Sequence, residues 1–169
     1  MILAIFGASA VGKTTLAGCL ASRLTLPLRH CGNAIREAAD VLGISPSDLS
    51  FETHHEVDAR TVDWCLSHAC LGCIVEGRFL DHVLAITPSI LFIELRADGS
   101  TRASRWARRL ERNFEESELA TVDEADAFFR QKMYESVPKG SAAMTIDTTC
   151  GTVKEWAEIV RTQLLGEPR

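Results

Sequence analysis

Residues Gly7 to Thr15 read GASAVGKTT and match the pattern G-x-x-x-x-G-K-[ST] of a phosphate-binding loop. The apolar run from Ile2 to Phe6 precedes the loop and a stretch with helical spacing follows it, which is the context that such a loop requires. Because Gly7 and Gly12 lack side chains, the backbone can turn tightly and present N–H groups to phosphate oxygens. The following helix would add the positive end of its dipole, so we expect anions to bind here.

The polar side chains of this loop favour ATP and Mg²⁺ as its ligands. Lys13 can bridge the β- and γ-phosphates during transfer, and the Thr14 hydroxyl can bind the metal ion. Lys13 is therefore a candidate catalytic residue and Thr14 a candidate metal ligand. We expect nine residues to bind ATP: Gly7, Ala8, Ser9, Ala10, Val11, Gly12, Lys13, Thr14 and Thr15.

Strand-like and helix-like segments alternate along the chain. Short apolar runs predict strands near residues 2–6, 28–29, 73–75, 90–93 and 144–146. Apolar stripes predict helices near residues 16–24, 34–42, 57–69, 103–110, 125–133 and 153–164. Ser45, Thr121 and Thr152 each have the residue type and spacing of a helix start. The alternation predicts one α/β domain over residues 1–169, with a five-stranded parallel sheet covered by helices on both faces.

The ends of the predicted strands carry the next candidates. Gly7, His30, Arg78 and Ala97 each follow such an end. Ligands of parallel sheets bind beyond the carboxyl ends of the strands, so we expect these four residues along one rim.

Arginines are the residues expected to hold a second, phosphorylated substrate. An acceptor phosphate must approach the donor phosphates, and cations must neutralise their repulsion. Arg36 lies one helical turn after Gly32, and Arg78 directly follows a predicted strand, so both could bind a monophosphate with two hydrogen bonds each. Each could instead be an ordinary solvated side chain.

A second group of arginines crowds one predicted helix. Arg102, Arg105 and Arg109 share a face, and Arg108 and Arg112 lie beside them. A mobile lid that closes over ATP would explain this density of positive charge. A surface helix with ion pairs to nearby glutamates is the alternative.

Composition narrows the class of protein. A net charge of -5 and a pI near 5.5 argue against nucleic-acid binding, and no apolar stretch is long enough to span a membrane. We therefore expect a cytoplasmic protein with a small-molecule substrate. Cys65, Cys70 and Cys73 have a spacing that iron–sulfur proteins also use, but reduced core thiols explain it as well.

Seven segments carry a resemblance to a known family. In order they are GASAVGKTT, CGNAIREAA, LGISPSDL, HEVD, IVEGR, RASRWARRLE and TIDTT. The chain resembles the cytidylate kinases of the P-loop nucleoside monophosphate kinase superfamily, especially their short archaeal-type branch, and the resemblance runs nearly from end to end. It implies a three-layer P-loop kinase fold that transfers the γ-phosphoryl group of ATP, with Mg²⁺, to CMP or dCMP. It also implies monophosphate-binding helices at roughly residues 30–70 and a lid at roughly residues 100–120, in a monomer or weak homodimer.

The resemblance also assigns roles to residues. It implies that Arg102 binds ATP and that Arg105 and Arg109 act on the transferred phosphoryl group. The residues that it assigns to the acceptor are Gly32, Arg36, Asp58, Gly77 and Arg78. The chain departs from the branch at residues 119–124, where an arginine is usual, and Arg130 is a candidate replacement. His54 and His55 also stand where the acceptor base would bind.

Two other functions remain open. A small-molecule kinase of the shikimate or gluconate kinase type would need a base near its hydroxyl acceptor. Glu37 is the sole acidic residue from Leu26 to Ala39, which favours a phosphate acceptor, although His30 could be such a base. The other alternative is a nucleotide-binding regulatory protein without turnover. A GTPase is disfavoured because the motif N-K-x-D is absent.

Overall fold

The computed structural model describes residues 1–78, 80–84, 90–136 and 143–166. The strands are β1 (Ile2–Gly7), β2 (Leu28–His30), β3 (Cys73–Glu76), β4 (Ile90–Arg96) and β5 (Ala143–Asp147). The helices are α1 (Lys13–Leu24), α2 (Cys31–Leu42), α3 (Phe51–His68), α4 (Asp81–Leu84), α5 (Gly99–Leu110), α6 (Glu116–Ser136) and α7 (Val153–Leu165).

The five strands form one sheet in the order β2-β3-β1-β4-β5, and every neighbouring pair is parallel. Each connection between parallel strands must cross over the sheet, and helices make these crossings. The predicted five-stranded parallel sheet with helices on both faces is confirmed. Within the described residues, no helix combines the length and apolar composition needed to cross a membrane.

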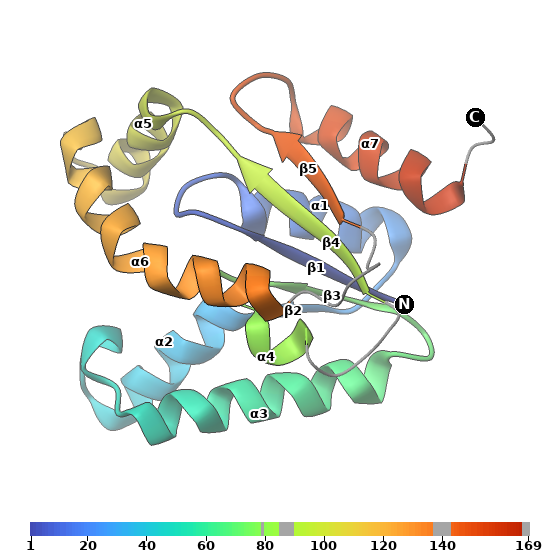
Figure 1. Ribbon diagram of the computed structural model, residues 1–169, viewed down its shortest axis with the longest axis horizontal. Helices are drawn as coiled ribbons and strands as arrows, with labels where there is room; N and C mark the ends of the chain where they lie inside the picture. The colour runs from blue at the N-terminus through green and yellow to red at the C-terminus, as the bar shows by residue number, and fades with distance from the viewer. Residues whose placement is uncertain (79, 85–89, 137–142, 167–169) are drawn as a thin grey trace.

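Alternate residues of the central strand β1 enter two separate cores, because successive side chains of a strand point to opposite faces. Leu3 and Ile5 belong to the core that α1 and α7 cover. Ala4 and Phe6 belong to the other core, which includes Cys65 from α3 and residues of α2 and α4. The sheet is therefore the middle of three layers. In Figure 1 the carboxyl ends of its strands lie on the side where α5 and the first turn of α2 are also found.

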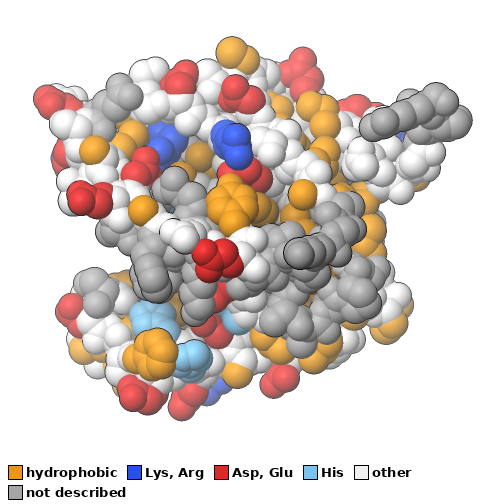
Figure 2. Space-filling model, viewed as in Figure 1, with side chains coloured by type: hydrophobic (Ala, Val, Ile, Leu, Met, Phe, Trp, Pro, Cys, Tyr) orange, Lys and Arg blue, Asp and Glu red, His pale blue; other side chains and the backbone are white. Residues whose placement is uncertain are grey.

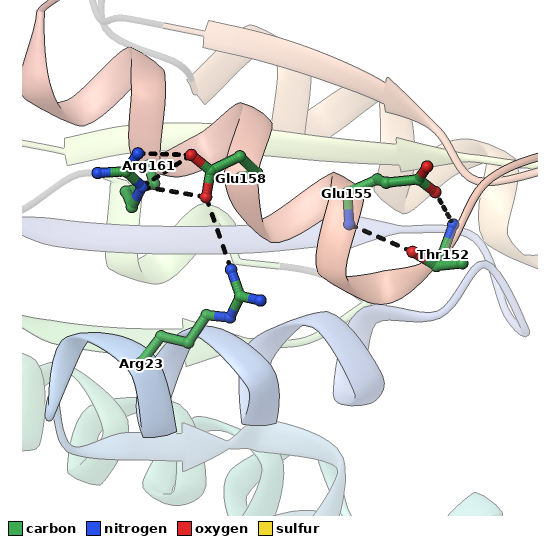
Figure 3. Close-up of polar contacts among 5 residues, drawn as sticks. All are labelled: Arg23, Thr152, Glu155, Glu158 and Arg161. Atoms are coloured by element: carbon green, nitrogen blue, oxygen red, sulfur yellow. Dashed lines mark hydrogen bonds and ion pairs between the residues drawn. The ribbon is translucent and has the colours of Figure 1, made fainter.

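Helix α7 starts at the predicted capping box and is joined to α1 (Figure 3). The Thr152 hydroxyl accepts from the backbone of Glu155, and the Glu155 carboxylate accepts from the backbone of Thr152 at 2.6 Å. Arg23 of α1 lies 3.6 Å from the carboxylate of Glu158 on α7. The first and last helices are thus held together on one face of the sheet.

Two predicted helix starts are wrong. Ser45 opens only a 3₁₀ turn at Pro46–Asp48, and Ser50 caps α3 by accepting from the backbone of Thr53 at 3.2 Å. Thr121 lies inside α6, which begins at Glu116. In both cases the capping pattern is present in the sequence, but packing sets the helix boundary elsewhere. The short helix α4 was also not predicted.

Candidate active site

The phosphate-binding loop connects β1 to α1 in a backbone conformation that needs glycine. Gly7 has φ 144° and Gly12 has φ 99°, a region that residues with a side chain rarely adopt. A Cβ atom on Gly7 would lie only 2.4 Å from the carbonyl oxygen of Leu95 on β4. The loop therefore fits against the sheet only with glycine at its first position.

The Lys13 ammonium group folds back over this loop. Its Nζ atom donates to the carbonyl oxygens of Gly7 and Ala8 at 2.9 and 2.8 Å. The positive charge is thus held over the turn of the loop, where phosphate oxygens would meet it. The hydroxyl-bearing Thr14 and Thr15 follow in the first turn of α1, and both are exposed.

Helices α1 and α2 begin without a side-chain cap, unlike three others. Gly12 and His30 are their N-cap residues, and neither makes a side-chain capping bond. Ser50, Asp98 and Thr152 do cap α3, α5 and α7. The N–H groups in the first turns of α1 and α2 are therefore not engaged by an N-cap side chain, and they can bind an anion.

Two arginines of α5 reach the phosphate-binding loop. Arg102 is 7% exposed and donates from Nε to the carbonyl oxygen of Ser9 at 2.9 Å. Arg105 donates to the carbonyl oxygen of Ala10 at 3.3 Å and to that of Thr148 at 2.6 Å. Burial lowers the pKa of Arg105 from its usual value. These contacts place α5 directly over the loop.

Arg109 near the end of α5 and Arg112 just after it make their contacts with other partners. The exposed Arg109 guanidinium packs 5.4 Å from the centre of the Trp106 ring, and Trp106 stacks on Phe114. Arg112 makes an ion pair with Glu118 at 2.9 Å. The structure therefore brings Arg102 and Arg105 to the loop, but not Arg109.

A buried carboxylate connects the starts of α1 and α2. Glu76, at the end of β3, has a side chain that is 7% exposed and pairs in register with His30 at the end of β2. Its Oε1 atom lies 2.9 Å from Nδ1 of His30 and accepts a 3.5 Å hydrogen bond from the Thr14 hydroxyl. One oxygen atom thus contacts residues at the starts of both helices.

The predicted acceptor residues lie after β2 and β3. Arg36 is exposed on α2 and donates to the side chain of Asn33, and a Cβ on Gly32 would lie 3.6 Å from its Nη1 atom. Gly77 packs tightly, since a Cβ there would lie 2.9 Å from Leu80. Arg78 follows it and is exposed. Arg36 thus lies on the helix that follows β2, and Arg78 lies two residues after the end of the neighbouring strand β3.

Asp58 of α3 lies beside histidines. Its carboxylate is 3.5 Å from Nε2 of His82, and burial raises its pKa while the histidine charges oppose this rise. His55 packs edge-on against Phe51 with ring centres 4.3 Å apart. Figure 2 shows histidine side chains gathered beside a hydrophobic one over α3. The sequence-predicted acceptor region therefore combines acidic, imidazole and aromatic groups.

Several contacts of the site involve residues outside the predicted set. Thr148 donates to the carbonyl oxygen of Val11 at 2.7 Å, and Asp123 binds Arg102. The pairing of Glu76 with His30 was also not predicted, although both residues end strands expected to be in the sheet. Arg130 falls in α6, but its side chain lies outside the described part of the structure.

The three closely spaced cysteines differ in burial. Cys65 and Cys73 are fully buried, whereas Cys70 is exposed, so only two of the three are core thiols. In the part of the chain that the structure describes, no three His, Cys, Asp or Glu side chains are arranged to hold a metal ion.

The residues at the loop fit ATP and Mg²⁺. The loop has no Cβ at Gly7, an ammonium group over its carbonyl oxygens and an uncapped helix behind it. Thr14 is an exposed residue, and its hydroxyl is the kind of hard oxygen ligand that Mg²⁺ prefers. Both groups therefore have suitable protein partners.

Comparison with known proteins agrees with this geometry. Residues 3–123 match the AAA domain family. The cytidylate kinase of Pyrobaculum islandicum is 30% identical over 135 residues, which cover 78% of this chain and 72% of that protein. The cytidylate kinase of Pyrobaculum neutrophilum is 29% identical over 134 residues, with the same coverage.

Solved structures show the same fold at lower identity. The shikimate kinase of Acinetobacter baumannii superposes with a TM-score of 0.64 at 16% identity, covering 97% of this chain and 92% of that one. The deoxyadenosine kinase of M. mycoides gives 0.56 at 17% identity, covering 99% of this chain and 100% of that one. The AAA domain match and the similarity to cytidylate kinases show that the chain belongs to the P-loop kinase family that includes the cytidylate kinases.

Proposed function

We propose that the protein is a nucleoside monophosphate kinase that transfers the γ-phosphoryl group of ATP to CMP or dCMP. The observation that carries this proposal is the pair of uncapped helices α1 and α2, whose starts both contact Oε1 of Glu76. Two phosphate groups, one from each nucleotide, would then bind at neighbouring helix starts. The cytidylate kinase relatives support cytosine as the acceptor base.

The donor site would use the loop and α5. Residues Gly7 to Thr15 would bind the phosphates of ATP, and Mg²⁺ on Thr14 would neutralise part of their charge. Lys13 would move from the loop carbonyl oxygens to the transferring phosphoryl group. Arg105 already contacts the loop, and Arg102 would act on ATP through its bond to Ser9.

The acceptor site would use residues roughly 30–70 and the turn after β3. Arg36 and Arg78 would bind the acceptor phosphate, with Gly32 and Gly77 allowing close approach, and Asp58 would face the nucleoside. Because these groups hold and neutralise two anions in line, catalysis would consist of positioning and electrostatic stabilisation without a covalent intermediate.

The lid would comprise roughly residues 100–120. Arg109 stacks on Trp106 away from the loop, so a movement of α5 would be needed to bring it to the phosphoryl group. Since Arg102 is tied to Ser9, the movement would involve the end of α5 that carries Arg109 more than its start.

A coupled ADP-release assay tests the acceptor. With saturating ATP and Mg²⁺, we expect CMP and dCMP to give the highest kcat/KM among CMP, dCMP, UMP, AMP and GMP. Turnover with a different monophosphate would change the assigned base. ATP binding by calorimetry without turnover on any of the five would instead favour a regulatory protein.

A further inference from the structure

The proposed transfer to a monophosphate gives the imidazole of His30 no proton to accept. An ionised phosphate acceptor attacks without losing a proton, so it needs no base. Yet the structure places a buried carboxylate against an imidazole at 2.9 Å, beside the loop that would hold the γ-phosphate. This arrangement is the one that activates a hydroxyl group in other enzyme classes.

The contact with Glu76 involves Nδ1 of the His30 ring, which leaves Nε2 on the other side of the ring. When Nδ1 donates its proton to Oε1 of Glu76, the neutral ring has its lone pair at Nε2. The His30 side chain is 26% exposed, so a ligand can reach the ring. Among the described residues, no hydrogen-bond partner of Nε2 is found. The ring therefore presents a free proton acceptor.

The pair also lies close to the donor site. The same Glu76 oxygen that binds His30 accepts from the hydroxyl of Thr14, the residue after Lys13. His30 is thus separated from the first turn of α1 by a single carboxylate oxygen. A hydroxyl bound to His30 would therefore approach the phosphoryl group from the side of β2 and α2, where the acceptor is expected to bind.

We propose that this centre also phosphorylates an alcohol, with His30 as the general base and Glu76 as the residue that orients it. The acceptor hydroxyl gives its proton to Nε2 of His30 as its oxygen forms a bond to the γ-phosphorus of ATP. The bond from that phosphorus to the β–γ bridging oxygen breaks, ADP leaves, and His30 then releases the proton to water. The proposal rests on the ATP site of the proposed function, but not on its monophosphate acceptor.

The test compares alcohols with CMP in one assay. Wild-type protein with ATP and Mg²⁺ is incubated with cytidine and deoxycytidine as nucleoside alcohols, with ribose, glucose and glycerol as small polyols, and with CMP. Phosphate esters are identified by ³¹P NMR and mass spectrometry. We expect an ester from at least one alcohol, and the two arms show whether a nucleoside or a polyol is the substrate.

Variants at His30 separate a base from a positioning residue. His30→Asn keeps an N–H group that can donate to Glu76 but has no atom equivalent to Nε2. We expect the ratio of alcohol to CMP transfer to fall by at least about tenfold in His30→Asn, the low end of the contribution of general-base catalysis. His68→Asn is the matched control, because the His68 ring bonds to the carbonyl oxygen of Trp64 near the far end of α3. Its ratio should match that of the wild type.

Two results would overturn the proposal. One is the absence of any phosphate ester in both alcohol arms. The other is an alcohol to CMP ratio that stays within about threefold of wild type in His30→Asn, which would make His30 a support for Glu76 only. If CMP does not react in the wild type, no alcohol to CMP ratio can be formed. The rate of alcohol phosphorylation in His30→Asn is then compared directly with the rate in His68→Asn. A His30-dependent ester without CMP turnover would then refute the monophosphate kinase and support the alcohol kinase.

Discussion

Arg102 of α5 donates a hydrogen bond from each of its two terminal nitrogens to the carboxylate of Asp123 on α6, and both bonds are 2.7 Å long. The same guanidinium donates from Nε to the carbonyl oxygen of Ser9. Because Arg102 is buried, its charge depends on this carboxylate for compensation. The contact thus connects the phosphate-binding loop, α5 and α6 through one side chain.

Asp123→Asn should destabilise the protein by about 2 kcal/mol, because it leaves the Arg102 charge without its anionic partner. The loss should be below that for a fully buried pair, since a third of the Asp123 side chain is exposed. Urea unfolding measures the change. Glu124→Gln, at the exposed neighbouring position, is the control and should alter stability by less than about 0.5 kcal/mol. Equal effects of both substitutions would show that the Arg102 contact adds nothing.

Gly7→Ala should cost at least about 3 kcal/mol, because it combines a positive φ with a Cβ atom 2.4 Å from a backbone oxygen. Gly18→Ala provides the opposite case within α1, since its Cβ would meet nothing within 4 Å. That substitution should stabilise the protein by about 0.5–1 kcal/mol through helix propensity. Thermal and urea unfolding of Gly7→Ala and Gly18→Ala measure both changes in stability. A stable Gly7→Ala protein would contradict the close packing of the loop on β4.

Lys13→Ala should lower kcat about a hundredfold or more and leave the fold intact, because it removes a preorganised positive charge from the transferring group. Lys13 bonds to two carbonyl oxygens of the loop and lies at the start of α1 rather than in the core, so circular dichroism and the melting temperature should change little. Steady-state kinetics measure the effect. Wild-type turnover in a folded variant would remove Lys13 from the catalytic residues.

Arg36→Ala should raise the KM for CMP at least about tenfold, because it removes a charge-assisted contact to the acceptor phosphate. The KM for ATP should stay within about twofold, since Arg36 lies on α2 and not on the loop. Arg60→Ala is the matched control, because Arg60 is an exposed arginine of α3 that pairs with Glu56. A larger rise in KM for ATP than for CMP would place Arg36 on the donor side.

The buried thiol of Cys31 should make the free energy of unfolding decrease at alkaline pH. Burial, with smaller contributions from Glu76 and Asp58, raises the pKa of its thiol to about 12 from a usual value of 9.0. Because the unfolded chain ionises first, this stabilisation is complete below about pH 9 and is lost as the pH rises toward about 12. Between pH 8 and pH 10 the unfolding free energy of wild type should fall by about 1 kcal/mol more than that of Cys31→Ala. If the unfolding free energies of wild type and Cys31→Ala, measured in urea, changed with pH in parallel, the thiol of Cys31 would have its usual pKa in the folded protein.

The sequence predicts the sheet well because its strands are short apolar runs between helical stripes. All five predicted strands are found, and their bounds differ from the expected ones by at most three residues, the largest difference being at the end of β4. Helix starts are less predictable, as Thr121 shows. Its spacing to Glu124 satisfies the capping pattern, but Thr121 lies inside α6, which begins at Glu116 and packs against α5.

The loop is the part of the site that sequence defines best, since its chemistry depends on local spacing. The arginines of α5 show the limit of this reasoning. Helical spacing places Arg102, Arg105 and Arg109 on one face, but only tertiary contacts assign Arg102 to Asp123 and Arg109 to Trp106. The Glu76–His30 contact likewise requires the strand order, because β2 and β3 are neighbours only in the folded sheet.

The bond from the Thr148 hydroxyl to the carbonyl oxygen of Val11 joins residues 137 positions apart. During synthesis on the ribosome, the glycine-rich turn emerges more than a hundred residues before Thr148, which braces it. The nascent chain should therefore acquire its full nucleotide affinity only after Thr148 has emerged, long after the turn itself has been made.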